Sequence, residues 1–191
     1  MFKTIRNAFK VKELREKILY TLMMLVVIRF GSQLPIPGIE TSFFANWFAK
    51  QTTDVFGFFN AMTGGSFSSM SIFALSITPY ITSSIIIQLL TIAIPKLEEL
   101  QKDGEDGRKK IQEYTRYTTV GLALIESSAM AIGFGRQGLL IDYNAWNIII
   151  AIVTMTTGSA LLMWIGEQIT EKGVGNGISI VLLFNILSSL P

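Results

Sequence analysis

The stretch from Phe73 to Leu90 is the feature that most restricts how this chain can fold. It reads FALSITPYITSSIIIQLL, which is long and apolar but contains five Ser and Thr residues. Ile77, Ile81 and Ile85 recur every four residues, so on a helix they form one slowly drifting stripe. A helix surrounded by lipid has no use for so many hydroxyl groups. We therefore expect a helix that faces both a protein interior and a wet cavity.

The composition places this helix in a membrane protein. Half of the 191 residues are hydrophobic and only 16% are charged, which is too apolar for an ordinary soluble domain. The sequence predicts an all-α membrane protein with one helical module at 18–191, preceded by a short basic segment at 1–17. Five stretches of the module read as membrane-spanning helices, at about 17–34, 71–94, 114–134, 145–166 and 174–191.

Basic residues are concentrated on one side of the predicted spans. Residues 1–17 and 96–116 each carry six Lys or Arg, and the loop at 167–177 carries one, whereas the opposite side carries only Lys50 and Arg136. Since loops rich in Lys and Arg stay in the cytoplasm, the N-terminus is expected to be cytoplasmic. Residues 1–17 read equally well as an amphipathic helix on anionic lipid or as a solvated tail.

A short apolar run separates the first two predicted spans. Residues 55–62 are too few to cross a bilayer, because a helix rises only about 1.5 Å per residue. Gly64 and Gly65 follow and are expected to act as a flexible hinge. We predict a short re-entrant helix at about 55–65, and the alternative is an aromatic helix lying at the membrane interface.

Prolines and charges mark the limits of the next spans. Pro79 falls inside the second predicted span, where it would remove a backbone hydrogen bond, and Pro95 is expected to end that span. The highly charged residues 96–116 are expected to form a loop in water. In the loop at 167–177, glycines alternate with other residues. A tight turn between two spans explains these glycines better than a phosphate-binding site does.

Apart from charged residues at the cytoplasmic ends, two of the predicted spans each contain one charged residue. Arg29, near the outer end of the first span, is expected to reach the interface or to bond neighbouring protein. Glu126, near the middle of the third span, is a candidate for function, and the alternative is a hydrogen-bonded packing contact.

The residues present argue against an enzyme. The chain has no cysteine and no histidine, which excludes thiolate or imidazole metal sites and any nucleophile that needs a histidine base. All four aspartates fall in predicted loops, so an intramembrane aspartate pair is absent. We expect no cofactor, no bound metal and no catalytic residue, which leaves passage of a substrate or scaffolding as functions.

Two long stretches resemble the SecY family, the channel-forming subunits of the bacterial protein translocon. They are Phe73–Leu90 and residues 162–179, which read LMWIGEQITEKGVGNGIS. The resemblance continues through PIPGI at 35–39, TGGSFSSMSIF at 63–73 and DGEDGRKKIQEYTRY at 103–117. Members of the family have ten spans in two inverted halves, so this chain resembles the N-terminal half.

The resemblance implies a role for each part of the predicted module. Ile77, Ile81 and Leu182 match positions of the apolar ring at the waist of the pore. Thr82, Ile85 and Gln88 match the lateral gate, through which signal sequences and transmembrane segments pass into lipid. The re-entrant helix matches the plug that seals the pore, with plug and hinge residues Phe58, Phe59, Asn60, Ala61, Met62, Gly64 and Gly65.

The resemblance also implies a location and partners. The location is the plasma membrane of a bacterium. The partners are the complementary C-terminal half, small subunits like SecE and SecG, the SecA ATPase or a ribosome, signal sequences and nascent polypeptides, and anionic lipids. Two alternatives remain open from the residues: a secondary transporter that uses Glu126, and a membrane scaffold module that pairs with another chain.

Overall fold

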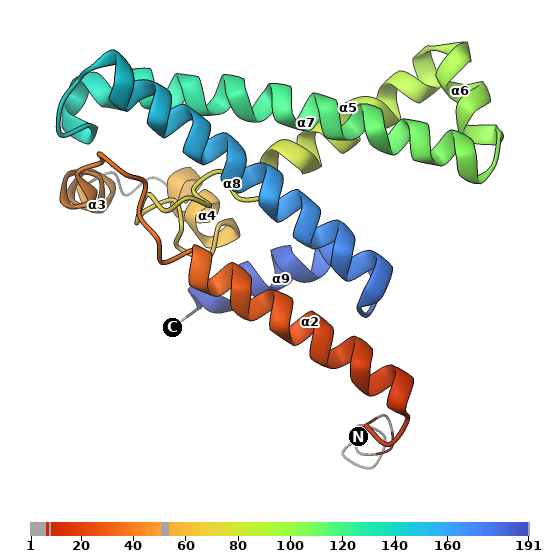
Figure 1. Cartoon of the computed structure of the whole chain (residues 1–191). Coiled ribbons are helices and arrows are strands. Elements are labelled where there is room, and N and C mark those ends of the chain that lie inside the picture. Colours follow the sequence, from red (N-terminus) through yellow and green to blue (C-terminus); the bar gives the residue numbers. More distant parts are fainter. Residues whose placement is uncertain (1–6, 8, 51–53, 191) are drawn as a thin grey trace.

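All regular structure in the computed structural model is helical within the residues that it describes, which are 7, 9–50 and 54–190 (Figure 1). Isolated bridges join Pro35 to Ser71 and Ile39 to Leu140. The predicted all-α class is therefore correct. The elements are α2 (Lys12–Gly31), α3 (Thr41–Lys50), α4 (Asp54–Met62), α5 (Thr78–Ala93), α6 (Pro95–Lys102), α7 (Glu105–Phe134), the π-helical turn η1 (Gly135–Leu139), α8 (Ala145–Lys172) and α9 (Gly177–Ser189).

Two helical stretches of the described chain are long and apolar enough to cross a membrane. They are Glu105–Leu139 and Ala145–Lys172, and a third exists if α5 and α6 count as one broken span. Helix α9 has 13 residues, and α2 has 20 but carries several charges in its first two turns. Five spans plus a re-entrant helix therefore remain a prediction. Residues 1–6 and 8 of the predicted basic segment, and Pro191 of the predicted fifth span, lie outside the described residues.

The second predicted span begins later than expected. Residues 71–77 form turns rather than helix, and α5 begins at Thr78 with Pro79 in its first turn. The prediction that Pro79 removes a hydrogen bond from mid-helix is wrong, because the first N–H groups of a helix have no intrahelical partner. Proline is well suited to this position, since its fixed φ already matches the helix.

The charged residues 96–116 are helical and do not form the predicted loop. Helix α5 ends at Ala93, Pro95 starts α6 at 103° to it, and α7 follows after a turn at Asp103 and Gly104. Glu, Lys, Arg and Gln are good helix formers, so a high charge density does not oppose a helix. On α6, Lys102 Nζ bonds Glu98 Oε1 one turn earlier at 2.6 Å.

The long helices form one packed group. Helix α7 lies against α5 and α8, and α8 also contacts α2 and α9 (Figure 1). Small residues allow the closest approaches: a Cβ on Gly158 of α8 would lie 1.9 Å from the carbonyl oxygen of Ile72. One buried cluster, which includes Ile28, Phe73, Ile77, Leu162 and Val181, joins α2, α5, α8 and α9.

A second cluster contains most of the aromatic residues between the first two predicted spans. Phe44 of α3 is fully buried and stacks on Trp47, while Phe67 and Phe134 meet it edge to face. Edge-to-face and offset stacked rings attract each other beyond the area that they bury. These side chains therefore bury one another and fix α3 beside the end of α7.

Candidate functional site

A cavity of about 420 Å³ lies between α5, α7, α8 and the start of α9. Its lining mixes apolar and polar side chains, including Ile81, Ile85, Gln112, Glu167, Asn176 and Ser179. This agrees with the expectation that the Phe73–Leu90 stretch faces a wet cavity. Of the residues singled out in the sequence, the cavity brings together Ile81 from the predicted ring and Ile85 from the predicted gate.

Helix α5 has one face buried in protein and one face free. Ser83, Ile87 and Thr91 are buried, and Ser83 Oγ donates to the Thr115 carbonyl oxygen of α7 at 3.3 Å. Ile85 and Gln88 are exposed, and Thr82 is partly buried with its hydroxyl bonded to the Thr78 carbonyl oxygen at 3.0 Å. The three predicted gate residues are spaced three apart along α5, and two of them, Ile85 and Gln88, are exposed.

The three predicted ring residues differ in burial. Ile77 is the N-cap of α5 and is 1% exposed within the cluster that joins α2, α5, α8 and α9. Ile81 is partly buried, packs against the same cluster and lines the cavity. Leu182 is partly buried and follows Val181, a member of that cluster. Ile77 and Ile81 thus share one apolar cluster with Val181 of α9, and Leu182 is the residue next to Val181.

The predicted plug corresponds to α4 and the turn that follows it. The helix has no buried residue, Phe58 is 69% exposed, and α4 contacts α9. Phe59, Asn60, Ala61 and Met62 are partly buried. Nine residues at about 1.5 Å each are too short to cross a membrane, as expected.

The predicted hinge is a defined turn. Gly64 and Gly65 both have left-handed φ, of 65° and 81°, which other residues adopt at a cost. The Gly65 N–H donates to the Asn60 carbonyl oxygen at 3.0 Å, and the Asn60 side-chain oxygen accepts from the Ser68 N–H at 3.0 Å. The glycines are needed here for the left-handed conformation rather than for unrestricted flexibility.

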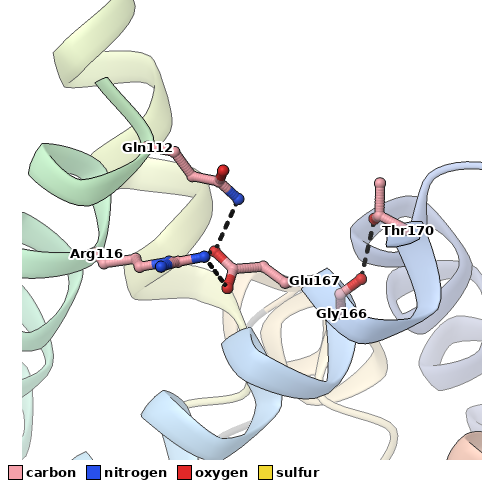
Figure 2. A network of polar contacts seen from close by, with 5 residues as sticks. All are labelled: Gln112, Arg116, Gly166, Glu167 and Thr170. Atoms are coloured by element: carbon pink, nitrogen blue, oxygen red, sulfur yellow. Dashed lines mark hydrogen bonds and ion pairs between the residues drawn. The ribbon is translucent and has the colours of Figure 1, made fainter. Parts of the chain in front are cut away.

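An ion pair that the sequence did not predict ties α7 to α8 beside the cavity (Figure 2). Arg116 Nε donates to Glu167 Oε1 at 2.9 Å, and its Nη2 lies 2.8 Å from Oε2, so the contact is bidentate. Gln112 Nε2 also donates to Oε1, at 3.2 Å. The Glu167 side chain is 7% exposed and that of Arg116 is 42% exposed.

Local sequence patterns do not indicate this ion pair, because they predict that Arg116 and Glu167 both lie in loops. Residues 96–116 were expected to be a loop in water, and 167–177 a turn between spans. In the structure α8 continues to Lys172, and the turn contains only residues 173–176. The opposite charges of Arg116 and Glu167 were the available signal, but nothing in the sequence joined them across 51 positions.

The glycine-rich turn between α8 and α9 is a packing element. Thr170 Oγ1 donates to the Gly166 carbonyl oxygen at 3.0 Å (Figure 2) and accepts from the Gly177 N–H at 2.9 Å. A Cβ on Gly177 would lie 1.9 Å from that same carbonyl oxygen, so the two helices meet backbone to backbone. Asn176 caps α9 by accepting from the N–H groups of Ile178 and Ser179.

The two ionisable residues of the predicted spans lie in different surroundings. Arg29 of α2 donates from Nη1 to the Gly64 carbonyl oxygen at 3.1 Å, in agreement with the expected bond to neighbouring protein. Glu126 of α7 is partly buried and lines a separate cavity of about 420 Å³, together with Phe56 and Phe59 of α4. It does not line the cavity that contains Ile81 and Ile85.

The described chain is all-helical, with at least two helical stretches long and apolar enough to cross a membrane and a partly polar space between its helices. The SecY family model matches residues 71–191. The chain therefore belongs to the SecY family, as its sequence motifs suggested.

Relatives in bacteria support this membership. The chain is 44% identical over 198 residues to the protein translocase subunit SecY of Corynebacterium glutamicum, covering 98% of this chain and 45% of that protein. It is 46% identical over 183 residues to the protein translocase subunit SecY of Escherichia coli K12, covering 94% and 41%. The chain thus spans less than half the length of these relatives.

Solved structures show the same fold. "Sec61 in the Canine ribosome-channel complex from the endoplasmic reticulum" and "The structure of a protein conducting channel" each match with a TM-score of 0.62 and 18% sequence identity. Each match covers 90% of this chain and 36% of the other. At this identity the likeness concerns the fold alone.

Proposed function

We propose that this chain forms the N-terminal half of a protein-conducting channel. The channel would pass unfolded secretory polypeptides across the membrane and release transmembrane segments sideways into lipid. The observation that carries the proposal is the cavity between α5 and α9, because Ile81 and Ile85 line it beside polar side chains. A second half would be needed to enclose the pore.

In this proposal Ile77, Ile81 and Leu182 contribute to an apolar ring. Apolar side chains around a narrow waist offer an ion no ligands to replace its hydration shell, so they form a barrier to ions. They can still move aside for an extended polypeptide, since they make no strong directional bonds with it. The apolar cluster that contains Ile77 and packs against Ile81 also contains Val181 of α9, the residue next to Leu182, which supports this assignment.

Helix α4 and its hinge would act as the plug. Its exposed Phe58, its lack of buried residues and its defined turn at Gly64 and Gly65 suit a small element that can leave its place without opening the core. Thr82, Ile85 and Gln88 would face the lateral gate. The exposure of Ile85 and Gln88 supports this role, because a gate requires a helix surface that is not permanently packed.

The proposed partners follow from family membership. They are a complementary C-terminal half, small subunits like SecE and SecG, signal sequences and nascent polypeptides, anionic lipids, and either the SecA ATPase or a ribosome to supply the driving force. The proposed location is the bacterial plasma membrane with the N-terminus in the cytoplasm, based on the distribution of Lys and Arg.

Crosslinking of a stalled secretory precursor tests the proposed function. The chain has no cysteine, so a Thr82→Cys variant carries a single reactive thiol in this half of the channel. We expect the signal sequence to crosslink at this position. Ser83→Cys is the matched control, because Ser83 is buried against α7 and should remain unlabelled. If the precursor crosslinks to neither Thr82→Cys nor Ile85→Cys, the proposal is wrong.

A second experiment tests the ring. In the reconstituted channel, Ile81→Gly should raise the ion leak, because it removes an apolar side chain from the waist. Leu89→Gly is the control, since it changes a residue on the same helix that is 61% exposed. Equal conductance of the two variants would contradict the ring assignment and leave the crosslinking result unaffected.

A further inference from the structure

Ser76 has a backbone conformation that residues other than glycine rarely adopt. Its φ is 53°, and it immediately precedes Ile77, the N-cap of α5. Ser159 Oγ of α8 donates to its carbonyl oxygen at 2.9 Å, and Asn185 Nδ2 of α9 donates to its hydroxyl oxygen at 3.2 Å. All three residues are buried. Such a conformation persists only where the surroundings fix it, and these two bonds help to hold the turn that precedes α5.

The same turn of α9 also contacts the hinge after α4. A Cβ on Gly64 would lie 3.3 Å from both the Cα and the carbonyl oxygen of Asn185, and 2.9 Å from Ser188 Oγ. Ser188 Oγ in turn donates to the Asn185 carbonyl oxygen at 2.8 Å. One turn of α9 therefore lies between the hinge and the start of α5.

Arg29 holds the hinge from the other side. Its Nη1 donates to the Gly64 carbonyl oxygen at 3.1 Å and lies 3.5 Å from Ser188 Oγ. This one guanidinium of α2 therefore connects the hinge to the last turns of α9. A hydrogen bond from a charged donor is stronger than one between neutral groups.

Asn185 is unusual in its helix. Helix α9 reads GISIVLLFNILSS, and Asn185 is its only amide side chain and is 6% exposed. Burying an amide costs free energy unless it is hydrogen-bonded, and an aliphatic side chain of similar size would carry no such cost. The bond from Asn185 to Ser76 gives this polar group a specific function.

We propose that Asn185 is a positioning residue that couples the hinge of α4 to the start of α5, with Arg29 and Ser76 as its connections on the two sides. The inference rests on the proposed function, in which α4 is the plug and Ile77 belongs to the ring. Movement of α4 carries Gly64 away from α9, which releases the turn that holds Ser76 and thereby frees Ile77. Plug and ring then open together.

A double-mutant cycle on the basal ion conductance of the reconstituted channel tests the coupling. We expect Arg29→Gln and Asn185→Leu each to raise the leak about tenfold, and the double variant to raise it no further, because both break one network. Arg136→Gln and Ser189→Ala are the controls. Ser189 Oγ bonds only within its own helix, to the Ile186 carbonyl oxygen, so its loss should leave the leak unchanged. A double variant whose leak is the product of the two single effects would overturn the proposal.

A distance measurement gives a readout that does not depend on conduction. Spin labels at Phe58→Cys on α4 and Ile85→Cys on α5 occupy exposed positions, and the chain has no other cysteine. Their distance distribution should broaden in Asn185→Leu. Ser76→Gly is a second variant that keeps the fold, since glycine adopts φ of 53° without strain, and it too should broaden the distribution.

The two readouts separate the inference from the proposed function. A precursor that crosslinks to neither Thr82→Cys nor Ile85→Cys would refute the proposed function, while broadening in Asn185→Leu would still support the structural coupling. Distributions as narrow in Asn185→Leu and Ser76→Gly as in Ser189→Ala would refute the coupling, whatever the channel conducts.

Discussion

The ion pair between Arg116 and Glu167 predicts an unequal response to removal of its two partners. Arg116→Met leaves the Glu167 carboxylate, whose side chain is 7% exposed, with Gln112 as its remaining donor in this network. Glu167→Gln leaves a guanidinium that is 42% exposed and can turn toward water. Removing Arg116 should therefore destabilise the protein more than removing Glu167, because it leaves a buried negative charge without its cation.

The expected magnitudes follow from this difference in burial. Breaking a buried ion pair so that a charge is left uncompensated costs about 3–5 kcal/mol, and we expect about 3 kcal/mol for Arg116→Met because Gln112 still donates to the carboxylate. Glu167→Gln keeps an acceptor oxygen and should cost about 1 kcal/mol. The double variant should be more stable than Arg116→Met alone, because it removes the uncompensated charge.

Unfolding in mixed micelles with increasing dodecyl sulfate, followed by tryptophan fluorescence, measures these free energies. Glu98→Gln is the control, since it breaks the exposed pair with Lys102 on α6 and should cause no measurable change. The reasoning is refuted if Glu167→Gln destabilises the protein as much as Arg116→Met does. It is also refuted if the double variant is the least stable of the three.

The remaining predictions concern packing, capping and the intramembrane carboxylate. Gly158→Ala should destabilise the fold by about 3 kcal/mol, because its Cβ would lie 1.9 Å from the carbonyl oxygen of Ile72. Gly133→Ala is the control, since the added Cβ would have no atom within 4 Å. It should be neutral or stabilise the helix by up to about 1 kcal/mol in the same unfolding assay. Asn176→Ala should cost about 1 kcal/mol through loss of the α9 cap, and Asn176→Ser should restore most of it. Glu126→Gln should raise stability by about 1 kcal/mol, since it removes a charge from a cavity lined by aromatic rings, and unchanged precursor transport in this variant would argue against a transporter that depends on this carboxylate.

Local sequence patterns predicted the helices well where one pattern dominates. The apolar residues of α8 and the stripe of Ile77, Ile81 and Ile85 identified helices with two kinds of face, and the cavity beside α5 agrees with that expectation. Helix limits were harder to predict. The high charge density of 96–116 predicts a loop, but the structure has α6 and the start of α7 there. Charged residues are common in helices and in loops, so charge alone does not distinguish the two.

Contacts between distant segments could not be predicted from local patterns. Residues 71–77 are apolar enough to extend a helix, but they turn because their backbone packs on α8 at Gly158 and because Ser76 is bonded by α8 and α9. The Arg116 and Glu167 pair likewise depends on the crossing of α7 and α8 (Figure 2). Family resemblance supplied roles for the ring, plug and gate residues, which no periodicity indicates.

The non-helical residues 71–77 have a mechanical consequence for α5. A helix that continued through them would resist bending, since each bend would break hydrogen bonds of its own ladder. Here the connection is a short irregular segment held by side chains of other helices. In the proposed channel α5 could therefore tilt as a rigid body about its N-terminal end without unwinding, by giving up these bonds and part of its packing on α7. The proposed pore, which would admit chains of differing bulk, would then yield at one point while its helices stay intact.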